Sequence, residues 1–501
     1  MKASAVGERK RYGVVSSALI VVAMRWADRL LGLISTLVLA RLLVPDDFGV
    51  IAMASIVYGF VTVLMNLGVN AALIHDKEAT QDDYDTAWTI RLIEAIVAGL
   101  VLAALAPAAA NYFNDPRVVD VMRVMAVTVA VAGLDNIGLV TFQKEMQFGS
   151  DFLFFFLRRF AGFLVTLILA FVLRSYWAMV IGSLVGKLVG VALSYAMHEM
   201  RPKLSLRKVR KIWSFSQLML LANIGNYLSV EMDKLVLGAR VSAATLGGYR
   251  LGDDIASMPT SEVLAPLGRV LFPSFVEARD EPDQLRQQFL LALGVQVALV
   301  LPAAVGLALV ADSAVPVLLG DQWAFAVPFI RWLALGQLAV ALSHATTYLF
   351  MSLGRVGSLA TISLGRVAVF MLLVLTVFAE AGGVVVAQLR GAVGVASVVA
   401  LVVLLLRTMQ GLTLADLARA TWRPALGCAL MAAVLTNVAT DSLPSGLALL
   451  IDVSIGAGVY GATIIGTWRL AGRPAGVESW VARRLGLHQR VPWLLGAAPG
   501  E

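Results

Sequence analysis

The sequence has 501 residues, of which 59% are hydrophobic and only 15% are charged, and its formal net charge is +7. Soluble globular proteins carry about 25% charged residues, so this composition excludes a water-soluble enzyme and predicts a polytopic helical membrane protein. Because the basic residues lie between apolar stretches, the positive charge indicates membrane topology and not nucleic-acid binding. The single cysteine, Cys428, excludes an intramolecular disulfide and a cysteine-built metal site.

The hydrophobic pattern predicts an all-α fold with fourteen transmembrane helices, since each apolar stretch is long enough for the ~20 residues that one crossing needs. In chain order, the predicted spans cover residues 14–43, 49–74, 86–110, 118–141, 152–173, 176–198, 215–239, 246–273, 288–311, 325–351, 356–379, 383–406, 421–440 and 446–469. The first apolar stretch follows a basic start and lacks a small-residue cleavage site. It is therefore predicted to be an uncleaved helix and not a signal peptide.

Lys and Arg residues are unevenly divided between the two sides of these spans. We count 25 on the side of the N-terminus, whereas the other side has Arg41, Arg117, Arg174 and Arg240. The positive-inside rule therefore predicts that both termini are cytoplasmic, which agrees with an even number of spans.

A weak internal repeat suggests how the spans are grouped. Residues 37–49 resemble residues 235–247 at an offset of 198 residues, or six spans, although chance similarity between apolar helices is the alternative. Six is even, so the two halves would share one orientation about an axis along the membrane normal. The predicted parts are a six-helix lobe (1–200), a cytoplasmic amphipathic linker (201–214), a second six-helix lobe (215–407), a helix pair (408–470) and a cytoplasmic tail (471–501). A basic amphipathic helix is predicted over 203–216, across the linker and the start of the second lobe.

Ionisable residues inside the spans are the most informative feature of the sequence, because each costs about 2.5–3.5 kcal/mol at a helix centre. Arginine suits phosphate because its planar fork makes bidentate hydrogen bonds. We predict a hydrated cationic cavity that binds an anionic substrate through Arg25, Arg29, Arg91, Lys187, Lys234 and Arg250. The acidic residues predicted to balance these charges, or to couple transport to protons or sodium, are Asp28, Asp135, Asp233, Asp253 and Asp254. The alternative is that these charges pair to lock helices together or reach toward the membrane interface.

Small-residue spacing and missing motifs narrow the function further. Gly182, Gly186 and Gly190 recur every four residues, which predicts close approach of another helix. The sequence has no G-x-x-x-x-G-K-[ST] motif, its four histidines are scattered, and no long outer loop could hold a glycosyl-transfer site. ATP hydrolysis, a cofactor and a polymerase or glycosyltransferase activity are therefore not expected, and transport is what remains.

Several short motifs resemble those of one transporter family. They are residues 39–49 (LARLLVPDDFG), 66–74 (NLGVNAALI), 232–238 (MDKLVLG), 246–249 (LGGY), 270–275 (VLFPSF) and 320–328 (GDQWAFAVP). Through these motifs the chain resembles the Wzx-type polysaccharide flippases, which belong to the multidrug/oligosaccharidyl-lipid/polysaccharide exporter superfamily. Among these flippases, it is most similar to the colanic-acid and exopolysaccharide branch. The similarity covers about residues 14–410.

The resemblance implies a fold and a function. The fold would have fourteen helices in two six-helix lobes plus a final pair, in a bacterial inner-membrane protein. The function would be non-enzymatic: translocation of an undecaprenyl-diphosphate-linked oligosaccharide from the cytoplasmic to the periplasmic leaflet by alternating access, for exopolysaccharide or lipopolysaccharide export, with polysaccharide polymerase and export machinery as further partners. Lipid II flippases of this superfamily have arginines and an aspartate of the first span in the cavity, which implies such a place for Arg25, Asp28 and Arg29. A cation-coupled multidrug exporter is the alternative function, although it would need an anionic cavity.

Overall fold

The computed structural model describes residues 26–65, 68–76, 78–145, 147–438, 443–472 and 479, with side chains except at 71, 75 and 210–222. Residues 26–42 form a first helix. The elements that follow are helical and include no strand in the described ranges: α2 (Pro45–Leu64), α3 (Val69–His75), α4 (Gln81–Phe113), α5 (Arg117–Ala132), η1 (Ile137–Leu139), α6 (Val140–Lys144), α7 (Phe148–Leu173), α8 (Trp177–Met197), α9 (Val209–Gly238), α10 (Ala243–Ala278), α11 (Pro282–Leu318), η2 (Asp321–Ala326), α12 (Val327–Ser352), α13 (Val356–Leu375), α14 (Gly383–Thr408), α15 (Leu414–Leu435) and α16 (Ser445–Leu470). The predicted all-α class is confirmed.

Many of these helices suit a membrane. Within the described ranges, nine helices are long and apolar enough to cross one, and a bent pair, Arg117–Ala132 with Ile137–Lys144, makes a tenth if it forms one span. The chain is therefore a multi-pass membrane protein, whereas the total of fourteen spans stays a prediction.

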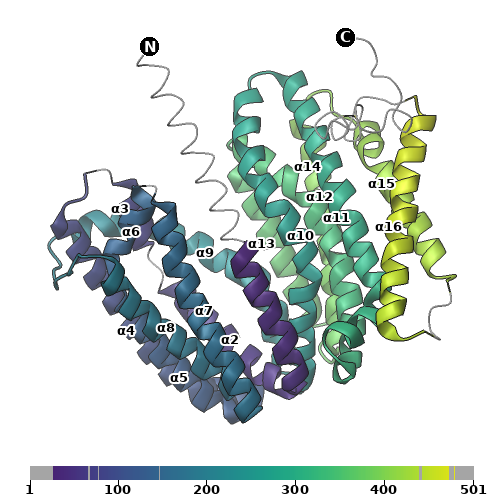
Figure 1. Cartoon of the computed structure of the whole chain (residues 1–501). Coiled ribbons are helices and arrows are strands. Elements are labelled where there is room, and N and C mark those ends of the chain that lie inside the picture. The colour runs from purple at the N-terminus through teal and green to yellow at the C-terminus, as the bar shows by residue number, and fades with distance from the viewer. Residues whose placement is uncertain are drawn as a thin grey trace, which may run out of the picture. The chain divides into compact units, whose positions relative to one another are not determined.

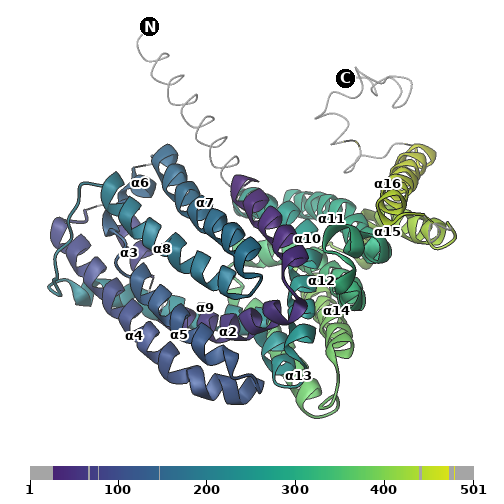
Figure 2. The same ribbon diagram turned by 60° about the horizontal axis from the view of Figure 1, so that its bottom comes forward.

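The chain divides into two compact units, Met1–Gly247 and Gly248–Glu501. In the first unit, α7 packs along α8, α4 packs along α5, and α2 packs against α9 (Figure 1). In the second unit, α12 packs against α11 and α14, and the last pair, α15 and α16, packs on α11 (Figure 2).

Two predicted spans are broken helices. The stretch predicted as 49–74 is two helices, α2 and α3, and Gly68 at the start of α3 has φ 68°, a backbone conformation that glycine adopts without strain. The stretch predicted as 118–141 bends by 68° after α5. Irregular backbone at membrane depth is tolerated where it is buried in protein or lines a cavity. The second break carries the candidate site described below.

The segment between α8 and α9 differs from the basic helix predicted over 203–216. Residues 201–206 are not helical, and α9 begins at Val209. The backbone N–H groups of this segment donate hydrogen bonds to side chains of α4: Lys203 to Asp85 Oδ1 at 3.1 Å and Ser205 to Thr89 Oγ1 at 2.9 Å. These contacts replace the hydrogen bonds that a helix would supply, and they tie the segment to the first turns of α4.

Candidate functional site

The break after α5 fixes a buried aspartate inside the first unit. Asn136 stabilises the break, because its side chain accepts the Gly138 N–H at 2.9 Å and donates to the Met200 carbonyl at 2.7 Å. The Asn136 N–H in turn donates to Ser194 Oγ on α8 at 2.9 Å. Asp135, the residue before it, is thus held among α4, α7 and α8, with its side chain 5% exposed.

Three cations surround this carboxylate. Asp135 Oδ2 lies 3.2 Å from Arg91 Nη2 on α4 and 3.7 Å from Arg158 Nη1 on α7. Lys187 on α8 is a third cation close enough to attract it electrostatically. We call Asp135, Arg91, Arg158 and Lys187 the Asp135 cluster. Its three positive charges against one negative charge leave a surplus of positive charge inside the membrane-spanning region.

A stripe of glycines on α8 lets Arg158 reach Asp135. A Cβ atom added at Gly182 would lie 1.9 Å from Thr166 Oγ1 on α7, and one at Gly186 would lie 3.2 Å from the Gly162 Cα. A Cβ at Gly190 would lie 2.7 Å from Arg158 Cδ, so the arginine stem crosses α8 at this glycine. The close helix approach predicted from the glycine spacing is confirmed, and it positions a cation as well as packing two helices.

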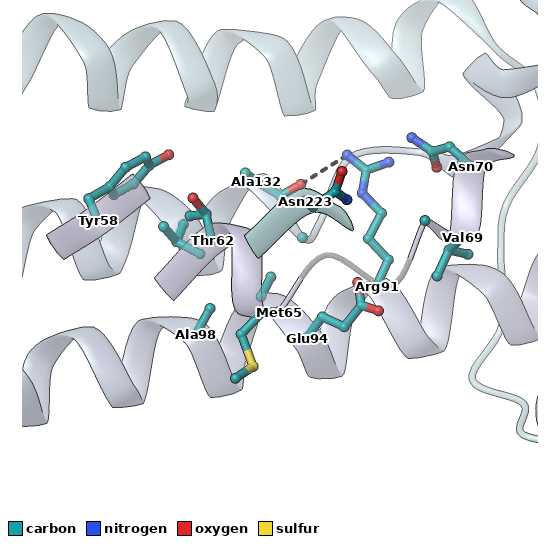
Figure 3. Close-up of a pocket in the computed structure, with 14 residues that line it drawn as sticks. Tyr58, Thr62, Met65, Val69, Asn70, Arg91, Glu94, Ala98, Ala132 and Asn223 are labelled. Atoms are coloured by element: carbon teal, nitrogen blue, oxygen red, sulfur yellow. Dashed lines mark hydrogen bonds between the residues drawn. The ribbon is translucent and has the colours of Figure 1, made fainter. Parts of the chain in front are cut away.

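A first cavity, of about 510 Å³, adjoins the cluster on the side of Arg91 (Figure 3). Arg91 lies on its wall, where the guanidinium also donates to the Ala132 carbonyl at 3.4 Å. Residues of five helices, α2, α3, α4, α5 and α9, and of the segments that flank them line this cavity: Tyr58, Thr62, Met65, Gly68, Val69, Asn70, Arg91, Glu94, Ala95, Ala98, Val129, Ala132, Gly133 and Asn223. Its charged residues, Arg91 and Glu94, balance each other.

A second cavity, of about 530 Å³, lies among the helix of residues 26–42, α7 and α8. Arg158 and Lys187 of the Asp135 cluster line it, together with Arg159 and Asp28. Arg159 Nε lies 3.3 Å from Asp28 Oδ1, and both side chains are more than half exposed. Three cations against one carboxylate make this cavity electropositive, unlike the first.

The Asp135 cluster joins the two cavities. Asp135 holds Arg91, which lines the first cavity, and Arg158, which lines the second. Tyr58 of the first cavity also lies within electrostatic range of Arg158. The arrangement can bind an anion in one cavity and a polar, uncharged group in the other. In the described part of the chain, no group of three or more His, Cys, Asp or Glu residues could hold a metal ion.

The structure brings only some of the predicted site residues together. Arg91, Asp135 and Lys187 belong to the cluster, and Asp28 lines the second cavity. Arg29, on the same helix as Asp28, is half-buried. Arg25 lies outside the described residues.

Lys234 and Asp233 lie on α9, away from the cluster. Both are buried, and Lys234 Nζ lies 3.4 Å from Glu231 Oε2 and 3.2 Å from the Val230 carbonyl. The Tyr112 hydroxyl, near the end of α4, donates to the neighbouring Leu235 carbonyl at 3.2 Å. Arg91 is 21 residues earlier on α4, or about 30 Å along the helix at ~1.5 Å per residue.

The remaining predicted residues lie on α10 in the second unit. Asp253 Oδ1 accepts a hydrogen bond from Arg390 Nη1 on α14 at 3.0 Å. Arg250 is half-buried and Asp254 is exposed. Asp253 therefore pairs with an arginine that the sequence analysis did not place in the site.

Sequence reasoning missed Arg158, because it was counted among the basic residues that set topology. A signal was present, since Arg158, Gly162 and Thr166 are spaced four residues apart and so share one face of α7. That face meets the glycine stripe of α8. Tyr58, Asn70 and Asn223 of the first cavity carried no comparable signal, because their placement depends on contacts between helices that are distant in sequence.

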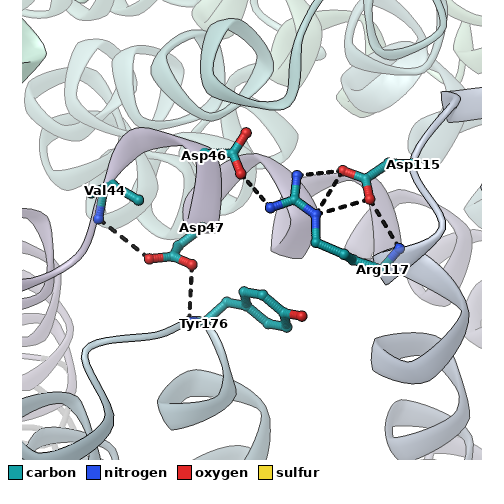
Figure 4. Close-up of polar contacts among 6 residues, drawn as sticks. All are labelled: Val44, Asp46, Asp47, Asp115, Arg117 and Tyr176. Atoms are coloured by element: carbon teal, nitrogen blue, oxygen red, sulfur yellow. Dashed lines mark hydrogen bonds and ion pairs between the residues drawn. The ribbon is translucent and has the colours of Figure 1, made fainter.

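A separate polar network holds the start of α2, in the motif LVPDDFG (Figure 4). Pro45 opens the helix, and the Asp47 carboxylate accepts N–H groups from Val44 at 3.3 Å and Tyr176 at 3.2 Å. Gly49 is required here, since a Cβ would lie 1.8 Å from the Ala243 carbonyl oxygen. Three residues of the motif thus have defined structural roles.

Asp46 of the same motif and Asp115 both bind Arg117, at the start of α5 (Figure 4). Arg117 Nη2 lies 2.6 Å from Asp115 Oδ2. Burial raises the pKa of Asp115, but the hydrogen bonds from Arg117 and its charge outweigh burial, so the pKa lies below the usual 3.8. This network ties α2 to the turn between α4 and α5.

Comparison with known proteins agrees with these features. The family model described as "Polysaccharide biosynthesis protein" matches residues 38–328. The succinoglycan biosynthesis transport protein ExoT of Rhizobium meliloti (strain 1021) is 26% identical over 302 residues, 60% of this chain and 61% of that protein. The lipopolysaccharide biosynthesis protein WzxC of Escherichia coli (strain K12) is 25% identical over 334 residues, 65% of this chain and 67% of that protein. The match to ExoT thus spans about three fifths of that relative's length.

Two solved structures share the fold. The lipid II flippase MurJ in an inward closed conformation superposes with a TM-score of 0.75 at 12% identity, over 91% of this chain and all of that one. An inward-facing multidrug resistance MATE transporter has a TM-score of 0.58 at 14% identity, over 82% of this chain and 96% of that one. The resemblance seen in the sequence is confirmed by the family model, and the chain belongs to the polysaccharide biosynthesis protein family.

Proposed function

We propose that this chain is a flippase that moves an undecaprenyl-diphosphate-linked oligosaccharide from the cytoplasmic to the periplasmic leaflet by alternating access. The relatives named for transport and for polysaccharide biosynthesis support this function. Translocation needs no covalent chemistry, so the side chains of the site have only to bind, solvate and release the substrate. In this proposal the protein lies in a bacterial inner membrane with both termini cytoplasmic, and polymerase and export machinery receive the product.

The observation that carries the proposal is the charge surplus of the Asp135 cluster. A buried charge inside a membrane is costly and is retained where it serves a ligand or a pathway. Arg158 and Lys187 line a cavity in which Asp28 is the only anionic side chain among the described residues. A diphosphate would supply the negative charge that this cavity lacks, and the arginine fork matches phosphate oxygens in bidentate geometry.

We assign the diphosphate to Arg158 and Lys187, with Arg91 held next to them by Asp135. The other cations predicted for substrate binding, Arg25, Arg29, Lys234 and Arg250, and the aspartates predicted for charge balance or ion coupling remain predictions. In the alternating-access cycle, the two lobes rock about a site near the membrane midplane. The lipid tail stays in the bilayer while the headgroup crosses.

A multidrug exporter is the alternative function. The likeness to a MATE transporter concerns the fold alone, at 14% identity. An exporter of organic cations needs a site with surplus negative charge, whereas the Asp135 cluster has a surplus of positive charge. The charge of the site therefore favours an anionic substrate.

Gene deletion and complementation test the proposal. Deletion should abolish the cell-surface polysaccharide and cause lipid-linked repeat units to accumulate on the cytoplasmic side. The wild type should restore export, and Arg158→Gln and Lys187→Met should not. Arg123→Gln is the matched control, since Arg123 is 62% exposed and pairs with Asp120 on the surface of α5. Unchanged polysaccharide together with altered drug tolerance would overturn the proposal.

A further inference from the structure

The two cavities of the first unit differ in the chemistry they offer a ligand. The described residues that line the second cavity include three cationic side chains and one carboxylate. Among the described residues, the first cavity has one cation, Arg91, and one carboxylate, Glu94, and the other polar groups that line it are uncharged. Two sites of different charge that lie next to each other suit a ligand with one charged part and one neutral, polar part.

Three polar side chains of the first cavity make no hydrogen bond within the part of the chain that the structure describes: the Tyr58 hydroxyl and the amides of Asn70 and Asn223 (Figure 3). They come from α2, α3 and α9, three different helices. Asn offers two N–H donors and a carbonyl acceptor, and a phenol offers one donor and an acceptor. Polar groups that line a cavity and make no hydrogen bond to the described residues are available to a ligand that both donates and accepts hydrogen bonds.

We propose that the first cavity is a saccharide subsite, which binds a sugar of the lipid-linked substrate while the second cavity binds its diphosphate. This inference rests on the proposed function and adds to it the part of the site that recognises the glycan. Sugar hydroxyls both donate and accept, as the Tyr58, Asn70 and Asn223 side chains do. The carboxylate of Glu94 and the guanidinium of Arg91 supply an acceptor and donors on the same wall.

The shape and lining of the cavity agree with a sugar ligand. Its volume of about 510 Å³ lies within the range of about 300–1,000 Å³ that is usual for small-molecule sites. Met65, Ala98 and Val129 give it apolar surface, which suits the C–H faces of a sugar ring. Polar and apolar walls together orient a ring that has hydroxyls at its edge.

Asp135 links the two subsites physically. Its Oδ2 atom contacts Arg91 at 3.2 Å and Arg158 at 3.7 Å, so the two guanidinium nitrogens are at most about 7 Å apart. Arg91 faces the saccharide subsite and Arg158 faces the phosphate subsite. Neighbouring groups of one molecule, a phosphate and the sugar attached to it, can therefore contact both arginines at once.

Binding measurements on the purified full chain in lipid nanodiscs test the inference. The probes are undecaprenyl diphosphate and its glucose- and galactose-linked forms, with the uncharged polyprenol as a blank. The wild type should bind at least one glycosylated probe more tightly than the bare diphosphate. The double variant Asn70→Ala/Asn223→Ala should bind that glycosylated probe about tenfold more weakly, since each lost hydrogen bond weakens binding severalfold. Its affinity for the bare diphosphate should stay at the wild-type value.

One control and one further cavity variant make the outcome decisive. Asn111→Ala removes an exposed amide of α4 that does not line the cavity, and it should leave every affinity unchanged. Tyr58→Phe removes only a hydroxyl, so it should weaken the glycosylated probe without affecting the fold.

The two hypotheses fail in different ways. Equal affinity of the wild type for the bare and both glycosylated probes, or an Asn double variant that binds all three as the wild type does, would overturn the saccharide subsite. The assignment of the diphosphate to the second cavity would still be supported if Lys187→Met no longer bound undecaprenyl diphosphate. Wild-type protein that binds undecaprenyl diphosphate no better than the polyprenol would overturn the proposed function itself.

Discussion

Replacing Asp135 by asparagine should strongly destabilise the first unit. The substitution keeps the shape of the side chain but removes the charge that Arg91 and Arg158 share. Removing one partner of a buried ion pair costs about 3–5 kcal/mol, because the remaining charge is left uncompensated. Both arginines are about one quarter exposed and line cavities, so we expect the lower end of this range, about 3 kcal/mol.

Repulsion between the two arginines accounts for much of this cost. Two unit charges at most about 7 Å apart repel by roughly 2 kcal/mol or more at an effective dielectric constant of about 20. For a unit of 247 residues, Met1–Gly247, a loss of 1 kcal/mol lowers Tm by about 2–4 °C. The expected decrease for Asp135→Asn is therefore about 6–12 °C.

The assay is thermal unfolding of the detergent-purified protein, followed by intrinsic fluorescence. Asp120→Asn is the matched control, because Asp120 and Arg123 form an exposed pair with side chains 67% and 62% accessible, worth under about 1 kcal/mol. Adding Arg158→Gln to Asp135→Asn should recover part of the lost stability, because it removes one of the two repelling charges. A Tm decrease no larger than that of Asp120→Asn, or strictly additive effects in the double variant, would refute this account.

Two further predictions concern helix packing and pH. Gly182→Ala should lower the free energy of unfolding by about 1–3 kcal/mol, because its Cβ would lie 3.0 Å from the Thr166 Cα and force α7 and α8 apart. Gly149→Ala on α7 is the control, because a Cβ there would have no atom within 4 Å. Equal Tm values for the two variants would contradict the packing argument. Burial lowers the pKa of His198 below 6.5, and its Nδ1 accepts the Met200 N–H at 3.1 Å, so the folded state disfavours the charged ring. Stability should then fall as pH drops below about 6.5, and His198→Gln should reduce this dependence. Equal pH profiles of Tm for the wild type and His198→Gln would refute this prediction.

The sequence was sufficient to predict the helical membrane fold and part of the candidate site. Intramembrane charges are costly, so Arg91, Asp135 and Lys187 stand out from the apolar residues around them. The glycine spacing of α8 predicted a close helix contact, because only small residues let two backbones approach. These inferences depend on local chemistry, which a single sequence records directly.

Features that depend on tertiary contacts were not predictable in the same way. The break after α5 looked like the middle of one span, since two of the hydrogen bonds that stabilise it are donated by Asn136 to Ser194 and Met200, more than fifty residues later. Lys234 was grouped with Arg91, although α9 places it near the other end of α4. Charge and hydropathy show that a residue lies in a span. Its neighbours on other helices can be inferred only when the register between those helices is known.

The measurement that tests the central claim most directly is lipid flipping by the purified chain in proteoliposomes. A fluorescent undecaprenyl-diphosphate-linked saccharide is placed in both leaflets, and a membrane-impermeant quencher reports how fast it exchanges between them. The account predicts exchange well above that of empty liposomes, and a loss of tenfold or more in Arg158→Gln/Lys187→Met at equal reconstitution. Exchange at the rate of empty liposomes, or a double variant as fast as the wild type, would contradict it.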